Sequence, residues 1–118
     1  MKLDTDKLRL EIHYGRPETA MEFYLKALEI DSTNMLTYFY MAFYYAFDGM
    51  TLLDDSYEKG IKYFKMALEY CDDTKKPFYI SLIYDNIGQV YENQSDNTKA
   101  LNYYSKCVEV CYITKKTF

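Results

Sequence analysis

The sequence predicts an all-α protein built from three stacked antiparallel helix hairpins. The stretch at 18–30 recurs in similar form at 58–70 and 98–110, with a spacing of 40 residues. Self-similarity at a fixed period of 20–50 residues indicates stacked structural repeats. Apolar residues in most other segments follow the helical period, and no segment alternates with the period of two that a half-buried strand shows. We therefore expect six helices and no strand.

Each copy of the repeated stretch carries a small residue, an aromatic residue four positions later, and a second small residue three positions after that. In chain order these sets are Ala20, Tyr24 and Ala27; Gly60, Phe64 and Ala67; and Ala100, Tyr104 and Cys107. Residues three and four positions apart lie on the same face of a helix. Each copy therefore presents two notches and one bulky side chain to a neighbouring helix.

The remaining boundaries follow from capping and helix-breaking residues. Gly15 ends a short first helix, and Pro17 suits the first position of the second helix. The polar run 31–34 supplies a turn and a cap, and Pro77 opens the fifth helix. The expected helices are 3–12, 17–30, 34–47, 55–72, 77–93 and 97–113. We group them as hairpins 2–30, 34–72 and 77–113 within a single domain, 1–118.

Composition limits the classes of function. The chain has 118 residues, of which 49% are hydrophobic, with 15 Tyr and no Trp. Its net charge of −4 argues against nucleic acid or an anionic membrane as partner. We find no run of 18 apolar residues and no signal peptide in the sequence. Three cysteines without a disulfide pattern fit a reducing compartment, so we expect a cytoplasmic protein.

The sequence offers no catalytic constellation. His13 is the only histidine, and the sequence places no nucleophile or carboxylate beside it. Cys107 and Cys111, four positions apart, could in principle supply two metal ligands. However, Cys107 occupies the small position that Ala27 and Ala67 fill in the other copies, so we interpret it as a packing residue. We expect a protein that is not an enzyme and has no metal or cofactor.

The third hairpin carries a known pattern. Its first helix has Tyr84, Ile87, Gly88 and Tyr91, and its second has Ala100, Tyr104 and Cys107. This resembles the tetratricopeptide repeat (TPR) family, whose pattern is Trp-x₂-Leu-Gly-x₂-Tyr followed by Ala-x₃-Phe over 34 residues. The second hairpin fits through Tyr38, Met41, Ala42, Tyr45, Gly60, Phe64 and Ala67. The first fits only from Gly15 onward, and it departs from the pattern at Asp4, Lys7, Leu8 and Glu11.

The spacing also departs from the family pattern. Tyr45 and Gly60 are 15 residues apart where Tyr91 and Ala100 are nine apart. A second anomaly of the same size separates Ala67 from Tyr84. We expect a bulged loop at about 48–55 and up to one extra turn in each of the helices at 55–72 and 77–93.

The resemblance implies a short right-handed solenoid whose concave groove is lined by the first helix of each hairpin. The residues that it places in the groove include Arg9, Leu36, Phe39, Tyr40, Phe43, Leu82, Asp85, Asn86, Gln89 and Glu92. One TPR subclass clamps a C-terminal carboxylate with lysines and asparagines. The matching positions here hold Thr5, Arg9, Tyr40, Leu82 and Asn86. Four of these five lack the expected side chain, so we exclude a carboxylate clamp.

The expected function is binding of a protein or peptide, as a scaffold or as the sensing part of a larger regulator. An aromatic floor beside an amide-and-acid rim suits a segment with an apolar anchor. The alternative for Phe39 and Phe43 is simple packing against neighbouring helices. The runner-up function is self-association: a solenoid usually needs a polar terminal cap, yet the last helix ends in the apolar run 110–113. Either the sequence is cut from a longer protein or this helix packs on another copy.

Overall fold

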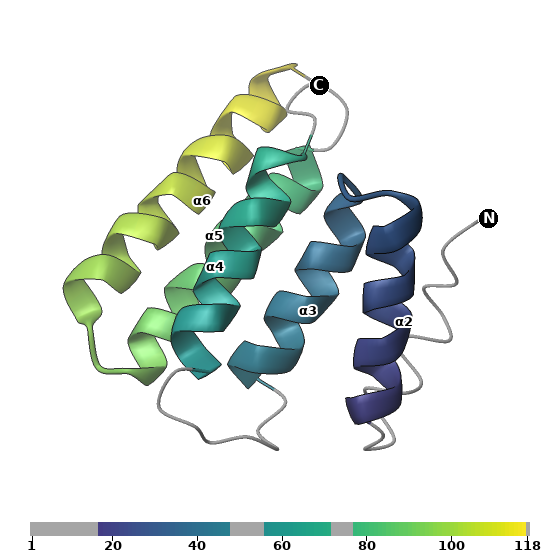
Figure 1. The fold of residues 1–118 in the computed structure, drawn as a ribbon. Helices are drawn as coiled ribbons and strands as arrows, with labels where there is room; N and C mark the ends of the chain where they lie inside the picture. The colour runs from purple at the N-terminus through teal and green to yellow at the C-terminus, as the bar shows by residue number, and fades with distance from the viewer. Residues whose placement is uncertain (1–16, 48–55, 72–76, 118) are drawn as a thin grey trace. The chain divides into compact units, whose positions relative to one another are not determined.

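The computed structural model of the chain describes residues 17–47, 56–71 and 77–117. These residues form five α-helices and contain no strand (Figure 1). The helices are α2 Pro17–Ile30, α3 Met35–Phe47, α4 Ser56–Glu69, α5 Pro77–Asn93 and α6 Asn97–Thr117. The expected all-α fold is confirmed. The helix expected at 3–12 and the bulged loop expected at 48–55 lie outside the described residues.

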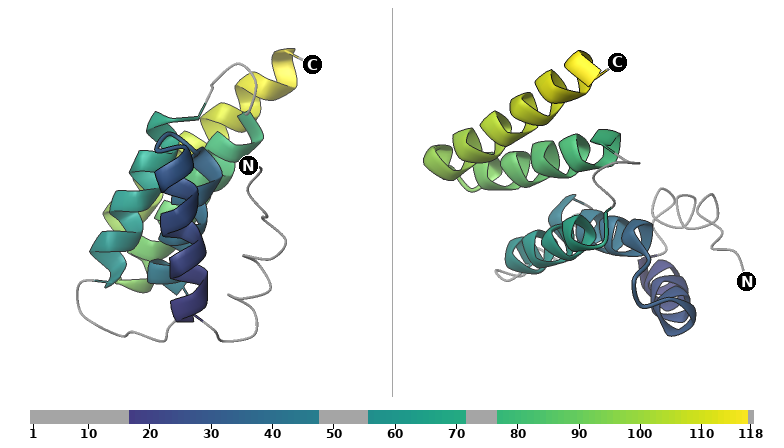
Figure 2. Two further views of the ribbon diagram at one scale, coloured as in Figure 1. Left: turned by 45° about the vertical axis from the view of Figure 1, so that its right-hand side comes forward. Right: turned by 90° about the horizontal axis from the view of Figure 1, so that it is seen from above.

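The chain divides between Ala67 and Leu68 into two compact units. The first contains α2, α3 and most of α4, and the second contains α5 and α6. Neighbouring helices pack closely within each unit, α2 along α3 and α5 along α6, as the further views also show (Figure 2). This arrangement confirms a repeat of helical hairpins. The single domain and the right-handed solenoid remain predictions.

The turn between α2 and α3 is closed by the polar run that the sequence singled out. The backbone N–H and the hydroxyl of Thr33 both donate to the Asp31 carboxylate, at 2.9 and 2.6 Å. The backbone N–H of Thr37 donates to Oδ1 of Asn34 at 3.0 Å, which caps the first turn of α3. The Tyr38 hydroxyl donates to the carbonyl of Ser32 at 2.7 Å and ties the turn to α3. The expected cap therefore starts α3 at Met35, one residue later than expected.

The turn between α5 and α6 is a Schellman motif with a serine in the left-handed position. Ser95 has a φ of 62°, and its N–H donates to the carbonyl of Glu92 at 2.9 Å. The N–H of Asp96 donates to the carbonyl of Tyr91 at 2.9 Å. The Asp96 carboxylate then accepts from the N–H of Lys99 at 3.2 Å and caps α6. Three residues thus reverse the chain and begin the next helix.

Two expected boundaries were wrong. α4 ends at Glu69 instead of residue 72, because a short-range hydrogen bond from Cys71 N–H to the carbonyl of Leu68 at 3.2 Å tightens the chain there. α6 continues to Thr117 instead of residue 113, since neither glycine nor proline follows Ile113 in the helix. α4 has 14 described residues and α5 has 17. Because both helices begin next to residues that the structure does not describe, the extra turn expected in each stays a prediction.

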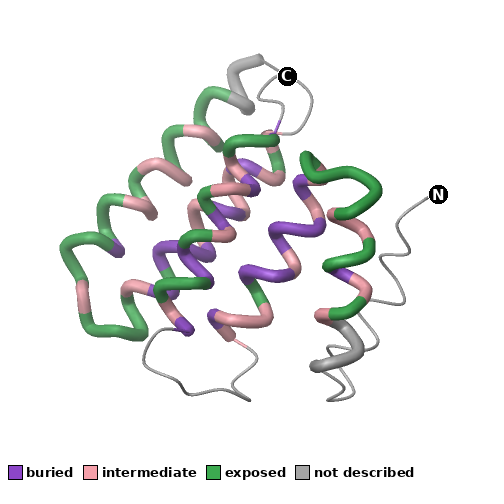
Figure 3. The backbone as a smooth tube through the Cα atoms, in the orientation of Figure 1, coloured by how far each residue is buried: buried purple, intermediate pink, exposed green. Residues whose placement is uncertain are grey.

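The bulky aromatic side chains of the repeated stretch are core residues in the first unit. Tyr24 of α2 and Phe64 of α4 are both 0% exposed (Figure 3). Tyr24 packs with Met41 of α3, and Tyr63 borders the same cluster. In the second unit Tyr104, the corresponding residue of α6, is only half-buried. The expected packing of a bulky aromatic side chain against a neighbouring helix therefore buries that side chain more fully in the first unit than in the second.

Two glycines mark close approaches between helices. A Cβ atom added to Gly88 of α5 would lie 2.6 Å from Cε1 of Tyr104 on α6. A Cβ atom added to Gly60 of α4 would lie 2.8 Å from Cβ of Ala46 on α3. Carbon atoms in contact normally lie about 3.5–4.0 Å apart. Both helix pairs therefore depend on the missing side chain.

We predict that Gly88→Ala destabilises the protein. Overpacking against Tyr104 costs roughly 1–3 kcal/mol, whereas alanine recovers about 1 kcal/mol of helix propensity. The Tyr104 ring cannot retreat freely, because its hydroxyl donates to Glu92 at 2.8 Å. The free energy of unfolding measured in urea should therefore fall by about 1 kcal/mol, and by about 2 kcal/mol at most. Gln89→Ala, at the exposed neighbouring position, should stay within about 0.5 kcal/mol of wild type. A Gly88→Ala protein as stable as wild type would contradict the close approach.

Candidate interaction surfaces

The aromatic residues expected to line a groove occupy two different environments on α3. Phe39 is 8% exposed, and its ring meets the ring of Phe64 edge-on at a centroid distance of 5.9 Å. Phe43, one turn later, is 36% exposed, although the centroid of its ring lies 4.9 Å from the centroid of the Phe47 ring. Leu36 and Tyr40 are half-buried. Phe39 is therefore a packing residue in this structure, and Phe43 is the aromatic side chain of the set that solvent reaches most.

The polar residues expected on α5 are partly engaged with one another. Nε2 of Gln89 donates to Oδ2 of Asp85 at 2.9 Å, one helical turn away. Glu92, exposed on the same helix, accepts the hydroxyl proton of Tyr104 at 2.8 Å. Asn86 is only 6% exposed and Leu82 is half-buried. The accessible part of this surface is thus an amide and two carboxylates along α5.

The candidate groove residues fall in two units, with α3 in the first and α5 in the second, so we describe their exposed side chains as two surfaces. A groove shared by the two helices stays a prediction. Arg9, the remaining candidate, lies outside the described residues.

A stack of three tyrosines joins α3 and α4, and the sequence analysis did not anticipate it. The Tyr63 ring of α4 lies nearly parallel to Tyr38 and to Tyr45 of α3, at centroid distances of 6.5 and 5.6 Å. The ammonium group of Lys59 lies 5.5 Å from the centroid of the Tyr45 ring. Such a cation over an aromatic face is favourable by about 0.5–1 kcal/mol at an exposed site.

The same arrangement recurs between α5 and α6. The ring of Tyr103 on α6 stacks on the ring of Tyr91 at a centroid distance of 5.6 Å. Its centroid lies 6.2 Å from that of the Tyr84 ring, which is tilted relative to it. The Nζ atom of Lys99 lies 5.4 Å from the centroid of the Tyr91 ring, and that of Lys106 lies 4.7 Å from the centroid of the Tyr103 ring. The signal was present in the sequence, because Lys59 and Tyr63 recur 40 residues later as Lys99 and Tyr103. The repeat pattern in the sequence analysis consists of the small residues and the central aromatic residue of each copy. It does not include these lysine and tyrosine positions, so it did not predict the stacks.

Hydrogen bonding and burial shift the pKa of three side chains. Hydrogen bonds from Thr33 lower the pKa of the Asp31 carboxyl, which keeps this turn residue ionised. Burial and the neighbouring Glu92 carboxylate raise the pKa of Tyr104 to about 12. Burial, with a smaller effect of Cys111, raises the pKa of the Cys107 thiol. Among the residues that the structure describes, no group of three or more His, Cys, Asp or Glu side chains could hold a metal ion.

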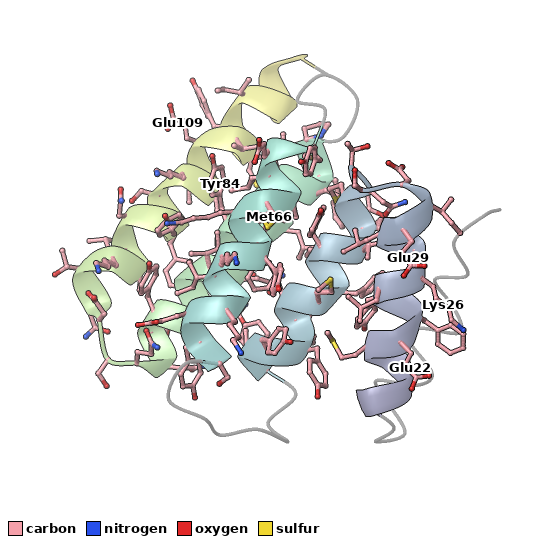
Figure 4. The ribbon with its side chains drawn as sticks, viewed as in Figure 1. Glu22, Lys26, Glu29, Met66, Tyr84 and Glu109 are labelled. Atoms are coloured by element: carbon pink, nitrogen blue, oxygen red, sulfur yellow. The ribbon has the colours of Figure 1, made fainter. Side chains whose placement is uncertain are left out.

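Charged side chains cover the side of α2 that faces away from α3. Glu22, Lys26 and Glu29 are all exposed, and Lys26 extends into solvent beside Glu22 and Glu29 (Figure 4). Glu109 is likewise exposed on α6. These acidic and basic residues alternate, so the outer face of α2 is a mixed, solvated surface. None of the helices in the described part of the chain combines the length and the apolar character needed to cross a membrane.

A comparison with protein families decides the classification. The family model described as tetratricopeptide repeat matches residues 10–34 and 82–112. The chain belongs to the tetratricopeptide repeat family. No curated protein and no solved structure gives a significant match. The matched segments include α2 and most of α5 and α6. The pair α3–α4 lies outside them, and its Tyr45–Tyr63 contact resembles the Tyr91–Tyr103 contact of α5–α6, with a ring-centroid distance of 5.6 Å in both.

We predict that Tyr104→Phe loses both a hydrogen bond and a tyrosine with a raised pKa. Removing the donor to Glu92 should cost about 0.5–1 kcal/mol of unfolding free energy, as for a solvent-accessible hydrogen bond. The folded-state pKa of about 12 lies above the ordinary tyrosine value of 10.0, so this tyrosine stabilises the fold below pH 10 and ceases to do so as pH rises through 12.

Absorbance titration of phenolate formation tests the assignment. The wild type should show a tyrosine that ionises near pH 12, and Tyr104→Phe should lack that step. Tyr112→Phe is the matched control, because Tyr112 is 58% exposed on the same helix. Loss of the late step in the control rather than in Tyr104→Phe would contradict the prediction.

Proposed function

We propose that this TPR chain is a non-catalytic module that binds a protein or peptide segment. TPR repeats generally mediate protein–protein interaction, which supports the class of function. The observation that carries the proposal is the exposure of Phe43 at 36% on a helix where Phe39 and Met41 are buried. Interface hot spots are commonly aromatic side chains that lie in packed surroundings but remain open to a partner.

The proposed ligand is an amphipathic helix or an extended segment with an apolar anchor and a basic residue. On the first unit, the anchor would contact Phe43 with Leu36 and Tyr40 beside it. On the second unit, the carboxylates of Asp85 and Glu92 form a separate surface that suits a basic residue. Both carboxylates already accept hydrogen bonds, from Gln89 and Tyr104, so their positions are fixed before a ligand arrives. Preorganised acceptors reduce the entropy that binding costs.

The proposal includes the absence of an enzymatic activity and a cytoplasmic site of action. Binding by surface complementarity needs no reactive group, and the family's repeats are typically non-catalytic scaffolds. Cys107 and Cys111 are free thiols, which favours a reducing compartment. The net charge of −4 favours a protein ligand over nucleic acid or an anionic membrane.

We predict that Phe43→Ala weakens binding of peptides selected from a displayed random library. Loss of a central aromatic contact should raise the Kd at least about tenfold, which corresponds to 1.4 kcal/mol. Phe78→Ala is the matched control, since Phe78 is 68% exposed but belongs to no predicted surface. Fluorescence anisotropy with purified peptides gives the Kd, and circular dichroism checks the fold. An unchanged Kd for Phe43→Ala would remove Phe43 from the site.

A second candidate function is self-association through α6. This helix exposes four large apolar side chains: Leu101, Val108, Tyr112 and Ile113 at 66%, 67%, 58% and 56%. Three of them, Leu101, Val108 and Tyr112, recur at intervals of seven and four residues and so lie on one face of the helix. A face of this kind can pack against the same face of a second copy.

Val108→Glu tests this second candidate. If α6 self-associates, the wild-type mass from light scattering should rise with protein concentration, and the variant should stay monomeric because a charge at the interface is costly to bury. Leu25→Glu on α2, where Leu25 is 53% exposed, should behave as wild type. A wild-type mass that equals one chain at every concentration would exclude self-association.

A further inference from the structure

The two cysteines of α6 differ in accessibility from their counterparts in the preceding repeat. Ala67 is 0% exposed and Cys71 is 8% exposed. Their equivalents 40 residues later are Cys107, which is half-buried, and Cys111, which is exposed. From the sequence alone Cys107 was interpreted as a packing residue like Ala67. Cys107 is half-buried, as Ala27 also is, so it can pack against α5 and still be reached from solvent.

The two thiols face one another across a single turn of helix. Cys107 and Cys111 are four residues apart in α6, which is helical from Asn97 to Thr117. Residues four positions apart lie on the same face of a helix, so the two side chains project from the same side of α6. Both are free thiols. An exposed sulfur and a half-buried sulfur thus form an adjacent pair that solvent can reach.

The helix prevents this pair from closing into a disulfide. Residues four apart on a helix have Cβ atoms about 5–6 Å apart, whereas a disulfide needs a Cβ separation of about 3.5–4.5 Å. An ion placed between the sulfurs fits the longer spacing. Two metal–sulfur bonds of about 2.3 Å span up to about 4.6 Å between the sulfur atoms. The intact helix therefore favours a bridging ion over a disulfide.

We propose that Cys107 and Cys111 form a two-sulfur binding site for a soft monovalent cation, Cu(I). Thiolates select soft ions such as Cu(I), and Cu(I) accepts linear coordination by two sulfurs. Zn²⁺ normally requires four ligands, and no group of three or more His, Cys, Asp or Glu ligands exists among the residues that the structure describes. Binding replaces the proton on each thiol, so two protons are released and no electron is transferred. The carboxylate of Asp85 acts electrostatically on Cys107 and favours a cation there.

Anaerobic competition against a chromophoric Cu(I) chelator tests the site in the full chain. The wild type should bind one Cu(I) per chain, with thiolate-to-copper absorption in the ultraviolet. Cys111→Ser and Cys107→Ala should each lower the affinity at least about a hundredfold, because one of two donors is lost. The alanine suits position 107, since Ala27 and Ala67 occupy the equivalent positions. Circular dichroism should show both variants folded.

Cys71→Ala is the matched control, because Cys71 is a buried thiol outside the pair and should leave Cu(I) binding unchanged. Three outcomes would overturn the proposal: Cu(I) bound equally well by Cys111→Ser, an affinity that depends on Cys71, or one Cu(I) per two chains with a copper-dependent doubling of mass. The last outcome would mean that the ion links two copies. Because peptide binding is measured separately on Phe43→Ala, failure of the copper site would leave the proposed function untouched.

Discussion

The helix pairs depend on a close approach that only very small side chains allow. Gly88 lets the Tyr104 ring lie directly against the backbone of α5, and Gly60 lets α4 approach Ala46 of α3. The buried aromatic positions follow from this approach, because Phe64 and Tyr104 occupy the helix faces that these contacts bring together. The tyrosine stacks also need the same short distance between helices. A side chain added at either glycine would disturb all of these contacts together.

The high tyrosine content has a structural explanation. In α3–α4 the ring of Tyr63 lies between two rings of the facing helix, and in α5–α6 Tyr103 lies in the same place. Each ring is half-buried or buried, so its apolar faces pack while its hydroxyl can stay near water. Lys59 and Lys99 then cover the outer ring in each stack. The tyrosine stack of α3–α4 thus resembles that of α5–α6, although the family model does not match α3–α4.

Packing and recognition share the same helices but use different side chains. On α3, Phe39 packs against α4 while Phe43 remains accessible one turn away. On α5, Asn86 is buried while Gln89 and Glu92 are exposed. The accessible members are the ones that can meet a partner without disturbing the core. The proposed Cu(I) site on the paired thiols of α6 would add a second type of chemistry to the chain.

The sequence by itself determined the helices and the repeat. The 40-residue period, the caps at Asn34 and Asp96 and the turn at 94–96 are local features, so they could be read without tertiary information. The tertiary structure alone decided which side of each helix is covered. Phe39 and Phe43 have the same chemistry and lie four residues apart, yet Phe39 is buried against Phe64 of α4 while Phe43 is 36% exposed. Cys107 likewise matches Ala67 in the repeat, but its exposure depends on what packs over α6, which no local pattern records.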